Sequence, residues 1–142
     1  MKATNFVLFI YAMTSLAFAT DTCIGRNSNG DCIKLFTEIA PNDYHWITTC
    51  ADQNPETPLS ECKNKIESNS LGDMAQLQCI DGPSVDKCRS LKKKQFANIN
   101  GKLELRITTT TTCISPGDVN TCDRFLVETN MNGKTFSKVY ER

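Results

Sequence analysis

The sequence has little of what most enzymes and nucleic-acid-binding proteins use. It contains one histidine, His45, and its charged residues balance to a formal net charge of +0. One histidine excludes a mechanism that needs two, and a neutral chain has no overall field that would steer it to nucleic acid or an anionic membrane. No nucleophile elbow, zinc-protease motif or glycine-rich phosphate loop is present. We therefore expect no cofactor and no nucleic-acid partner.

Long apolar runs are also scarce, and the one that exists lies near the N-terminus. Residues 1–19 combine Lys2, an apolar segment of about 13 residues and the small residues Ala17 and Ala19. This pattern is typical of a secretory signal peptide, and the apolar segment is too short to span a bilayer. We expect a signal peptide at 1–19, one monomeric domain at 20–142, an extracellular location and no transmembrane segment.

Cysteine is plentiful, and all eight cysteines follow residue 19. An even number in a secreted chain predicts four disulfides, and the absence of close cysteine pairs argues against a metal site. Short and long intervals alternate, so we favour local pairing, although other connectivities remain open. The expected disulfides are Cys23–Cys32, Cys50–Cys62, Cys79–Cys88 and Cys113–Cys122.

The same spacing indicates four degenerate units, which begin near residues 23, 50, 79 and 113. Three of the short loops open with Cys-Ile, and each loop is followed by a run, a turn signal and another run. The last two turns are Asn100-Gly101 and Asn132-Gly133, and Asn-Gly is the strongest short hairpin signal. The sequence therefore predicts a mainly β fold, with α+β as the alternative: a small disulfide-stapled sheet, sandwich or barrel built of hairpins.

Some details of this fold can also be predicted. Leu103, Leu105 and Ile107 alternate with charged residues and should share a buried face. Residues 108–112 are five threonines without apolar alternation, which indicates an exposed or edge strand. At most one or two short helices are expected, at 63–77 or 84–96. Phe125, Val127, Phe136 and Tyr140 should share a second face.

The triplet Tyr44-His45-Trp46 contains the only side chain that could shuttle protons near neutrality. One hypothesis is a ribonuclease-like hydrolase centred on His45. Glu38 or Asp43 would act as base, and Arg106 or Arg124 would bind phosphate. The alternative, which we favour, is a strand with a buried tryptophan between two exposed rings, so we assign no catalytic residue.

Arg89, Lys92, Lys93 and Lys94 place four cations within six residues. Such a cluster could bind an anionic partner, for instance a sulfated glycan. It could equally be a solvated turn, a set of charged residues that protects the following apolar hairpin from aggregation, or a proteolytic processing site. We take these residues, with Tyr44, His45 and Trp46, as the candidate binding residues.

Three resemblances add to this interpretation. A signal peptide, about 120 mature residues, eight cysteines and no catalytic motif look like a small cysteine-rich secreted effector of a fungus or another host-associated eukaryote. Residues 97–103 (ANINGKL) look like the hairpin element of cyanovirin-type lectins, but four cysteine units do not fit two lectin repeats. The segment from Leu103 through the last loop is similar to the end of the Alternaria-allergen-like β-barrel family.

The function expected from these observations is that of a secreted, non-enzymatic binding protein of effector or virulence type. Its cysteine loops would contact an extracellular protein or glycan of a host or competitor, because binding residues usually lie on loops of a rigid scaffold. The alternatives are the His45 hydrolase, an antimicrobial or toxin-like protein that uses the 89–94 cluster, and a lectin-like carbohydrate-binding protein.

Overall fold

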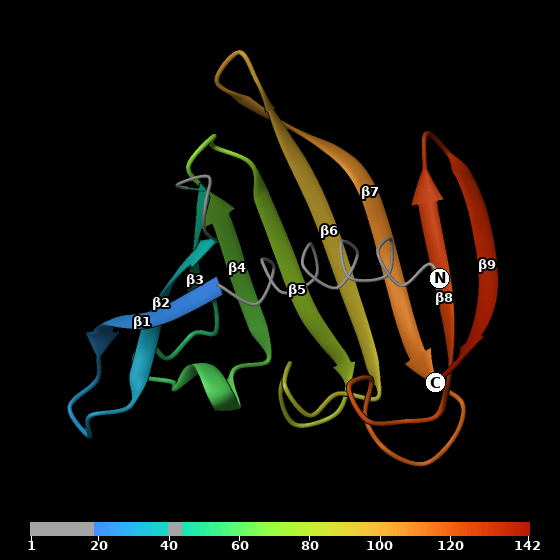
Figure 1. The fold of residues 1–142 in the computed structure, drawn as a ribbon, viewed down its shortest axis with the longest axis horizontal. Coiled ribbons are helices and arrows are strands. Elements are labelled where there is room, and N and C mark those ends of the chain that lie inside the picture. The colour runs from blue at the N-terminus through green and yellow to red at the C-terminus, as the bar shows by residue number, and fades with distance from the viewer. Residues whose placement is uncertain (1–18, 40–43) are drawn as a thin grey trace, which may run out of the picture.

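Nine antiparallel strands form one continuous open sheet in the computed structural model of the protein, which describes residues 19–39 and 44–142 (Figure 1). The strands lie side by side in chain order, so β1 and β9 are the two edges. The strands are β1 (Ala19–Arg26), β2 (Cys32–Ile39), β3 (Tyr44–Cys50), β4 (Asn64–Asn69), β5 (Met74–Asp81), β6 (Ser90–Ile99), β7 (Lys102–Cys113), β8 (Arg124–Met131) and β9 (Lys134–Glu141). The mainly β prediction is confirmed, and the form adopted is an open sheet.

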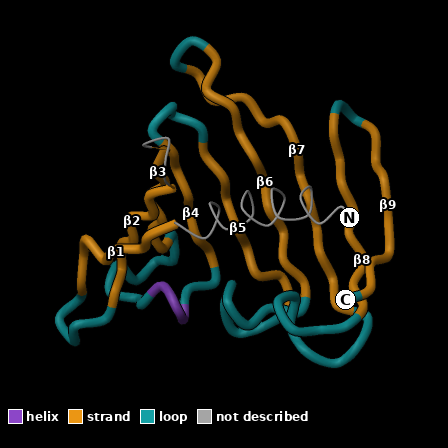
Figure 2. Tube along the Cα trace, in the orientation of Figure 1, coloured by secondary structure: helices purple, strands orange, loops and turns teal. Residues whose placement is uncertain are grey.

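The two ends of the sheet differ in their connections. At one end, four longer loops gather, and each joins an odd-numbered strand to the next even-numbered strand (Figure 2). At the other end lie short turns, of which two are the predicted Asn-Gly turns, with φ of 54° at Asn100 and 55° at Asn132. Asparagine and glycine tolerate this left-handed conformation, so these pairs can close hairpins with the twist that strands require.

Each of the four loops is closed by one of the predicted disulfides, with sequence separations of 9, 12, 9 and 9. No free cysteine occurs in the described chain. The four disulfides indicate an oxidising, extracellular environment. The pairing expected from local spacing is therefore confirmed, and so is the recurrence of loop, strand, turn and strand.

The buried part of the molecule lies at these loops rather than between two layers. Five of the nine buried hydrophobic residues in the described ranges are half-cystines. The loops also bond to each other: the Val85 N–H donates to the Cys62 carbonyl at 2.7 Å, and the Val119 N–H donates to the Cys88 carbonyl at 2.7 Å. The third and fourth loops thus each use a valine, six residues after their first cysteine, to attach to the loop before them.

Arg142 continues this series beyond the fourth loop. Its backbone N–H donates to the Asp123 carbonyl at 2.8 Å. In the third and fourth units, the backbone N–H of the first cysteine donates in the same way to the carbonyl that follows the second cysteine of the preceding loop. Its guanidinium donates to the Cys122 carbonyl at 2.8 Å and to the Val119 carbonyl at 2.7 Å, and it lies 4.6 Å from the Phe125 ring centroid. Arg142 therefore satisfies carbonyls that a further loop would otherwise cover.

Neither segment in which we expected a helix is helical. Residues 63–77 contain β4 and the first half of β5, and residues 84–96 contain a loop and most of β6. Apolar residues are sparse in both segments, so a helix there would have no stripe to bury, whereas a strand pairs with both neighbours. The only helical element in the described residues is the 3-10 turn η1 (Leu59–Glu61), and none of them forms a helix that could cross a membrane.

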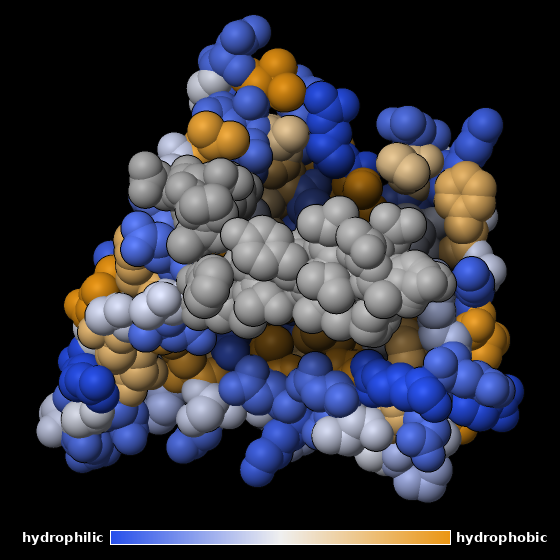
Figure 3. Space-filling model, viewed as in Figure 1, coloured by the Kyte–Doolittle hydropathy of each residue, from blue (hydrophilic) through white to orange (hydrophobic). Residues whose placement is uncertain are grey.

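Two further expectations are wrong. The threonine run at 108–112 lies in β7, an interior strand paired with β6 and β8, and its side chains are half-buried. Leu103 and Leu105 are 43% and 52% exposed, because the β6–β7 hairpin projects beyond the neighbouring strands of the described chain (Figure 1). Hydrophobic residues are accordingly visible near the tip of the molecule where this hairpin ends (Figure 3).

The expectation of a second shared face, on the last hairpin, is confirmed. The register of β8 and β9 places Phe125, Val127, Phe136 and Tyr140 on one face.

Two disulfides close loops of equal length but differ in burial. Comparing them separates the contribution of side-chain packing to stability from the contribution of loop-closure entropy. Replacement of Cys79 and Cys88 by alanine should lower the free energy of unfolding by more than replacement of Cys23 and Cys32. Both pairs are separated by 9 residues, which corresponds to about 2.5 kcal/mol of loop-closure entropy. Of the two pairs, only Cys79 and Cys88 are buried, so loss of that disulfide should cost about 1 kcal/mol more. Urea denaturation of both variants measures the difference, and equal losses would contradict the buried role of the loops.

Replacement of Arg142 by alanine should lower the free energy of unfolding by about 1 kcal/mol, because two charge-assisted hydrogen bonds to loop carbonyls disappear. The matched control is Arg124→Ala, which removes a solvent-exposed ion pair to Glu141 and should cost less. Thermal and urea unfolding of residues 20–142 provide the comparison. If both variants lose the same stability, Arg142 does not cap the loop series.

Candidate functional site

The sheet has two faces, and the strand register assigns every paired side chain to one of them. The groove face carries Trp46, Ala75 and Gln95, and the first cysteine of each loop lies on it as well. The lysine face carries His45, Gln76 and Lys94. These two names are used below for the two sides of the sheet.

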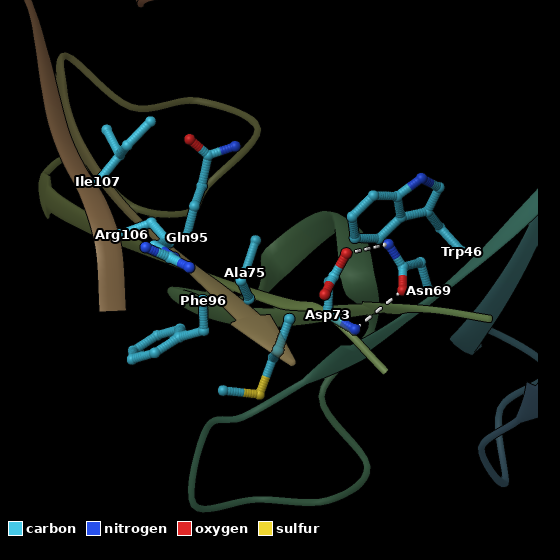
Figure 4. Close-up of a pocket in the computed structure, with 10 residues that line it drawn as sticks. Trp46, Asn69, Asp73, Ala75, Gln95, Phe96, Arg106 and Ile107 are labelled. Carbon is cyan, nitrogen blue, oxygen red and sulfur yellow. Dashed lines mark hydrogen bonds between the residues drawn. The ribbon is translucent and has the colours of Figure 1, made fainter. Parts of the chain in front are cut away.

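The groove face is hollowed near its centre. Two neighbouring cavities of about 280 and 340 Å³ share Trp46, Ala75 and Gln95 as lining residues. Ala75 is only 3% exposed and has the smallest side chain of its row, so it forms the floor. Figure 4 shows Trp46 at one end of the first cavity, Ile107 at the other and Ala75 between them. We call these two cavities together the groove.

The floor of the groove is one row of directly paired residues. Register pairs Thr48 with Glu67, Glu67 with Ala75, Ala75 with Gln95 and Gln95 with Ile107. Neighbouring strands lie about 4.8 Å apart, so this row crosses five strands in a straight line. The groove therefore depends on pairings between segments that are up to about 60 residues apart in the sequence, which local patterns do not specify.

A β-bulge brings Arg106 to the groove. Gln95 pairs with Ile107 and Phe96 pairs with Leu105, which leaves Arg106 as an extra residue on β7. A bulge bends the strand and redirects a side chain, and here Leu105 consequently faces the opposite side from Ile107. The expectation that Leu103, Leu105 and Ile107 share one face is wrong for this reason. Arg106 lines the cavity beside Gln95 (Figure 4).

Asp73 is held in place at the edge of the groove by the neighbouring strands. Its carboxylate accepts the Asn98 backbone N–H at 2.8 Å and the Asn69 side-chain amide at 3.2 Å. These two bonds, the first more than the second, keep the pKa of the Asp73 carboxyl below its ordinary range. The Asn69 side chain is in turn fixed by the backbone N–H groups of Leu71 and Asp73. Asp73 is therefore an ionised, preorganised acceptor.

The charges that line the groove balance. The first cavity is lined by Asp73 and Arg106, and the second by Glu67 and Lys93. Each cavity thus offers one carboxylate and one cation beside the Trp46 wall, and the Gln95 amide serves both. These groups can donate and accept hydrogen bonds in several directions. Their charges cancel, so they favour a neutral ligand over an anion or a cation.

The structure brings Glu38 beside His45 but separates both from the arginines of the hydrolase hypothesis. His45 lies on the lysine face, stacked on Phe36 at a centroid distance of 4.9 Å and paired with Glu38. Arg106 and Arg124 lie on β7 and β8, four and five strands away from β3. Asp43 lies outside the described residues, and Tyr44 is described only as a strand residue paired with Ile39. Trp46 is half-buried and belongs to the groove.

The cationic cluster is also divided. The Arg89 guanidinium donates to the Gly117 carbonyl at 2.6 Å and to the Ser115 carbonyl at 3.3 Å, so it links the third and fourth loops. Lys93 lies on the groove face, whereas Lys92 and Lys94 lie on the lysine face. All three lysines belong to β6, an interior strand paired on both sides, where a protease would not find the extended free backbone that it needs.

Comparison of the chain with protein-family models, with curated proteins and with solved structures finds no match. The site is therefore interpreted from its own geometry. Sequence reasoning named Trp46 and Lys93 as candidate binding residues, and Arg106 only as a phosphate-binding residue of the hydrolase hypothesis. It missed Glu67, Asp73 and Gln95, because these residues come together only through the register of β3 to β7.

Replacement of Asp73 by asparagine should lower the melting temperature at pH 7, because the Asn98 N–H loses its ionised acceptor. A depressed pKa contributes stability that is present above the ordinary value of about 4 and is lost as the pH falls through the folded-state value. The difference between Asp73→Asn and the natural protein should therefore shrink below about pH 4.

Thermal unfolding measured by circular dichroism from pH 7 to pH 2.5 checks this expectation. The control is Asp31→Asn, since the Asp31 carboxylate makes no hydrogen bond or ion pair within residues 19–39 and 44–142. A gap between Asp73→Asn and the natural protein that stays constant with pH would show that the anchoring carboxylate does not act through its charge.

Proposed function

We propose that the protein is a secreted binding protein whose groove holds a neutral saccharide of an extracellular glycan. The observation that carries this proposal is the pairing of an aromatic wall, Trp46, with two balanced sets of hydrogen-bonding groups on the two sides of Ala75. The predicted signal peptide and the four disulfides support an extracellular site of action.

The position of the groove favours a ligand recognised by side chains alone. The groove lies over β3 to β7, whose backbone N–H and C=O groups are used by strand pairing on both sides. A peptide that binds by strand addition needs a free sheet edge, and the groove offers none. A saccharide needs no backbone partner, since its hydroxyls bond to carboxylates, amides and cations.

The chemistry of the lining matches both kinds of surface that a sugar ring presents. The indole of Trp46 provides an apolar plane for the C–H face of the ring. Asp73 and Arg106 in one cavity, and Glu67 and Lys93 in the other, can bond to hydroxyls around its edge. Each cavity is close to the lower size limit of small-molecule sites, which suits one sugar unit per cavity.

This proposal moves the binding surface away from the cysteine loops. Val85, Val119 and five of the half-cystines are buried there, and Arg89 bonds the third loop to the fourth, so we assign the loops to the scaffold rather than to partner contact. The effector and virulence interpretation remains part of the proposal in one respect: the glycan would belong to a host or a competitor. The proposal retains the non-enzymatic interpretation, since His45 and the arginines lie far apart on the sheet.

Trp46→Ala should weaken saccharide binding by about tenfold or more, because the apolar wall is lost. Arg106→Gln should also weaken it, and its exposed side chain makes the variant safe for folding. The matched control is His45→Ala, which alters the next residue on the opposite face and should leave binding unchanged. Residues 20–142 are screened on an array of neutral oligosaccharides, and the best ligand is measured by calorimetry.

Circular dichroism establishes that each variant is folded before binding is compared. The proposal would be overturned if no neutral oligosaccharide binds above background, or if Trp46→Ala and Arg106→Gln bind as well as the natural protein. Loss of binding in His45→Ala with an unchanged melting curve would instead assign the function to the lysine face.

A further inference from the structure

The lysine face carries a second cluster, which is independent of the groove. Lys92 pairs with Gln78 on β5 and with Thr110 on β7, and Lys94 pairs with Gln76 and Thr108. The two lysines are two residues apart on one strand, so both side chains leave the sheet on the same side, about 7 Å apart.

These side chains enclose a small hollow. A cavity of about 40 Å³ is lined by four residues only: Gln76, Gln78, Lys92 and Lys94. Its lining therefore consists of two ammonium groups and two amides, and every one of them can donate hydrogen bonds. The volume is about that of a single water or one small polar group.

The cations at this hollow are not neutralised. Within residues 19–39 and 44–142, the ion pairs are Lys65–Asp86 and Arg124–Glu141, and neither involves Lys92 or Lys94. All four strand neighbours of the two lysines are uncharged. The nearest carboxylates by register are Asp81, paired with Ser90, and Glu128, two strands away. Two unpaired cations surrounded by amides and hydroxyls favour an oxyanion.

We infer that this hollow is an oxyanion site, and that its ligand is a pendant sulfate or carboxylate group of an extracellular polysaccharide. The hollow is small and lies on one face of interior strands, so a single pendant group of a polymer can enter while the polymer chain runs over the surrounding threonines and glutamines. Gln76 and Gln78 are exposed and line this path.

Other polyanions fit this surface less well. A bilayer would require exposed side chains that insert into it, whereas Lys92 and Lys94 are half-buried on an interior strand. Double-stranded nucleic acid carries a charge about every 1.7 Å and is held by many cations at once. The hollow provides two, and the other strand cations of this face by register include Lys34 on β2 and the ion-paired Arg124 on β8. A polysaccharide with one anionic group per sugar unit matches a single hollow with two cations.

The register supplies an unusually close control for the test. The double variant Lys92→Gln/Lys94→Gln removes both cations of the hollow, and Lys93→Gln removes one cation of the same strand on the opposite face. Binding of residues 20–142 to immobilised dextran sulfate is measured by surface plasmon resonance, with unsulfated dextran as the reference polymer.

We expect binding to dextran sulfate, no binding to dextran, and an affinity at least about tenfold lower for the double variant. Lys93→Gln should bind as the natural protein does. A second variant, Gln78→Glu, places a carboxylate in the hollow at an exposed position and should weaken binding without a change in melting temperature. Binding should also fall when salt is raised from about 0.1 M to about 1 M.

Three outcomes would overturn the inference. Equal loss in Lys93→Gln and the double variant would mean a diffuse charge effect. Unchanged binding in both the double variant and Gln78→Glu would remove the hollow from the site. Tighter binding to anionic vesicles or to an oligonucleotide than to dextran sulfate would assign the surface to another partner. Trp46→Ala should retain dextran sulfate binding, so failure of the groove proposal leaves this test intact.

Discussion

The structure depends on the attachment of each disulfide-closed loop to the loop before it. Within residues 19–39 and 44–142, the single sheet has no opposing layer against which it could bury a face, and neither face is continuously apolar. Burial is concentrated at the loops, where half-cystines and two valines exclude water. Hydrogen bonds from Val85 and Val119 join consecutive loops, and Arg142 extends the series. Covalent closure and loop stacking thus replace the core that a two-layer domain would have.

This arrangement leaves both faces of the sheet available for polar chemistry. The side chains of Glu67, Gln95 and Lys93 occupy central positions that a sandwich would fill with leucine or valine. The groove and the lysine hollow lie on opposite sides of the same strands, and Lys93 and Lys94 contribute to one each. Because successive side chains of β6 point to opposite faces, the two proposed binding sites use neighbouring residues of one strand.

Features encoded locally could be read from the sequence, and features encoded by register could not. The spacing of Cys79 and Cys88 predicts their disulfide because a short polar loop brings its own ends together, and Asn100-Gly101 predicts its turn for a similar reason. The bulge at Arg106 has no such signal, since an arginine between two apolar residues looks like one more outward-facing position. The groove was missed because Glu67, Asp73 and Gln95 meet only after several strands have paired, and no short pattern marks them.

The strict order of the strands also determines how the chain can acquire its covalent framework. Every strand pairs only with its neighbours in the chain, and no cysteine is separated from its partner by more than 12 residues. Loops of this size close far faster than long ones, and they can close while the rest of the chain is still being made. A polypeptide that enters an oxidising compartment progressively can therefore complete one cross-link before the next pair of thiols arrives. The order of synthesis and the order of native oxidation can therefore coincide, which would leave each thiol few wrong partners.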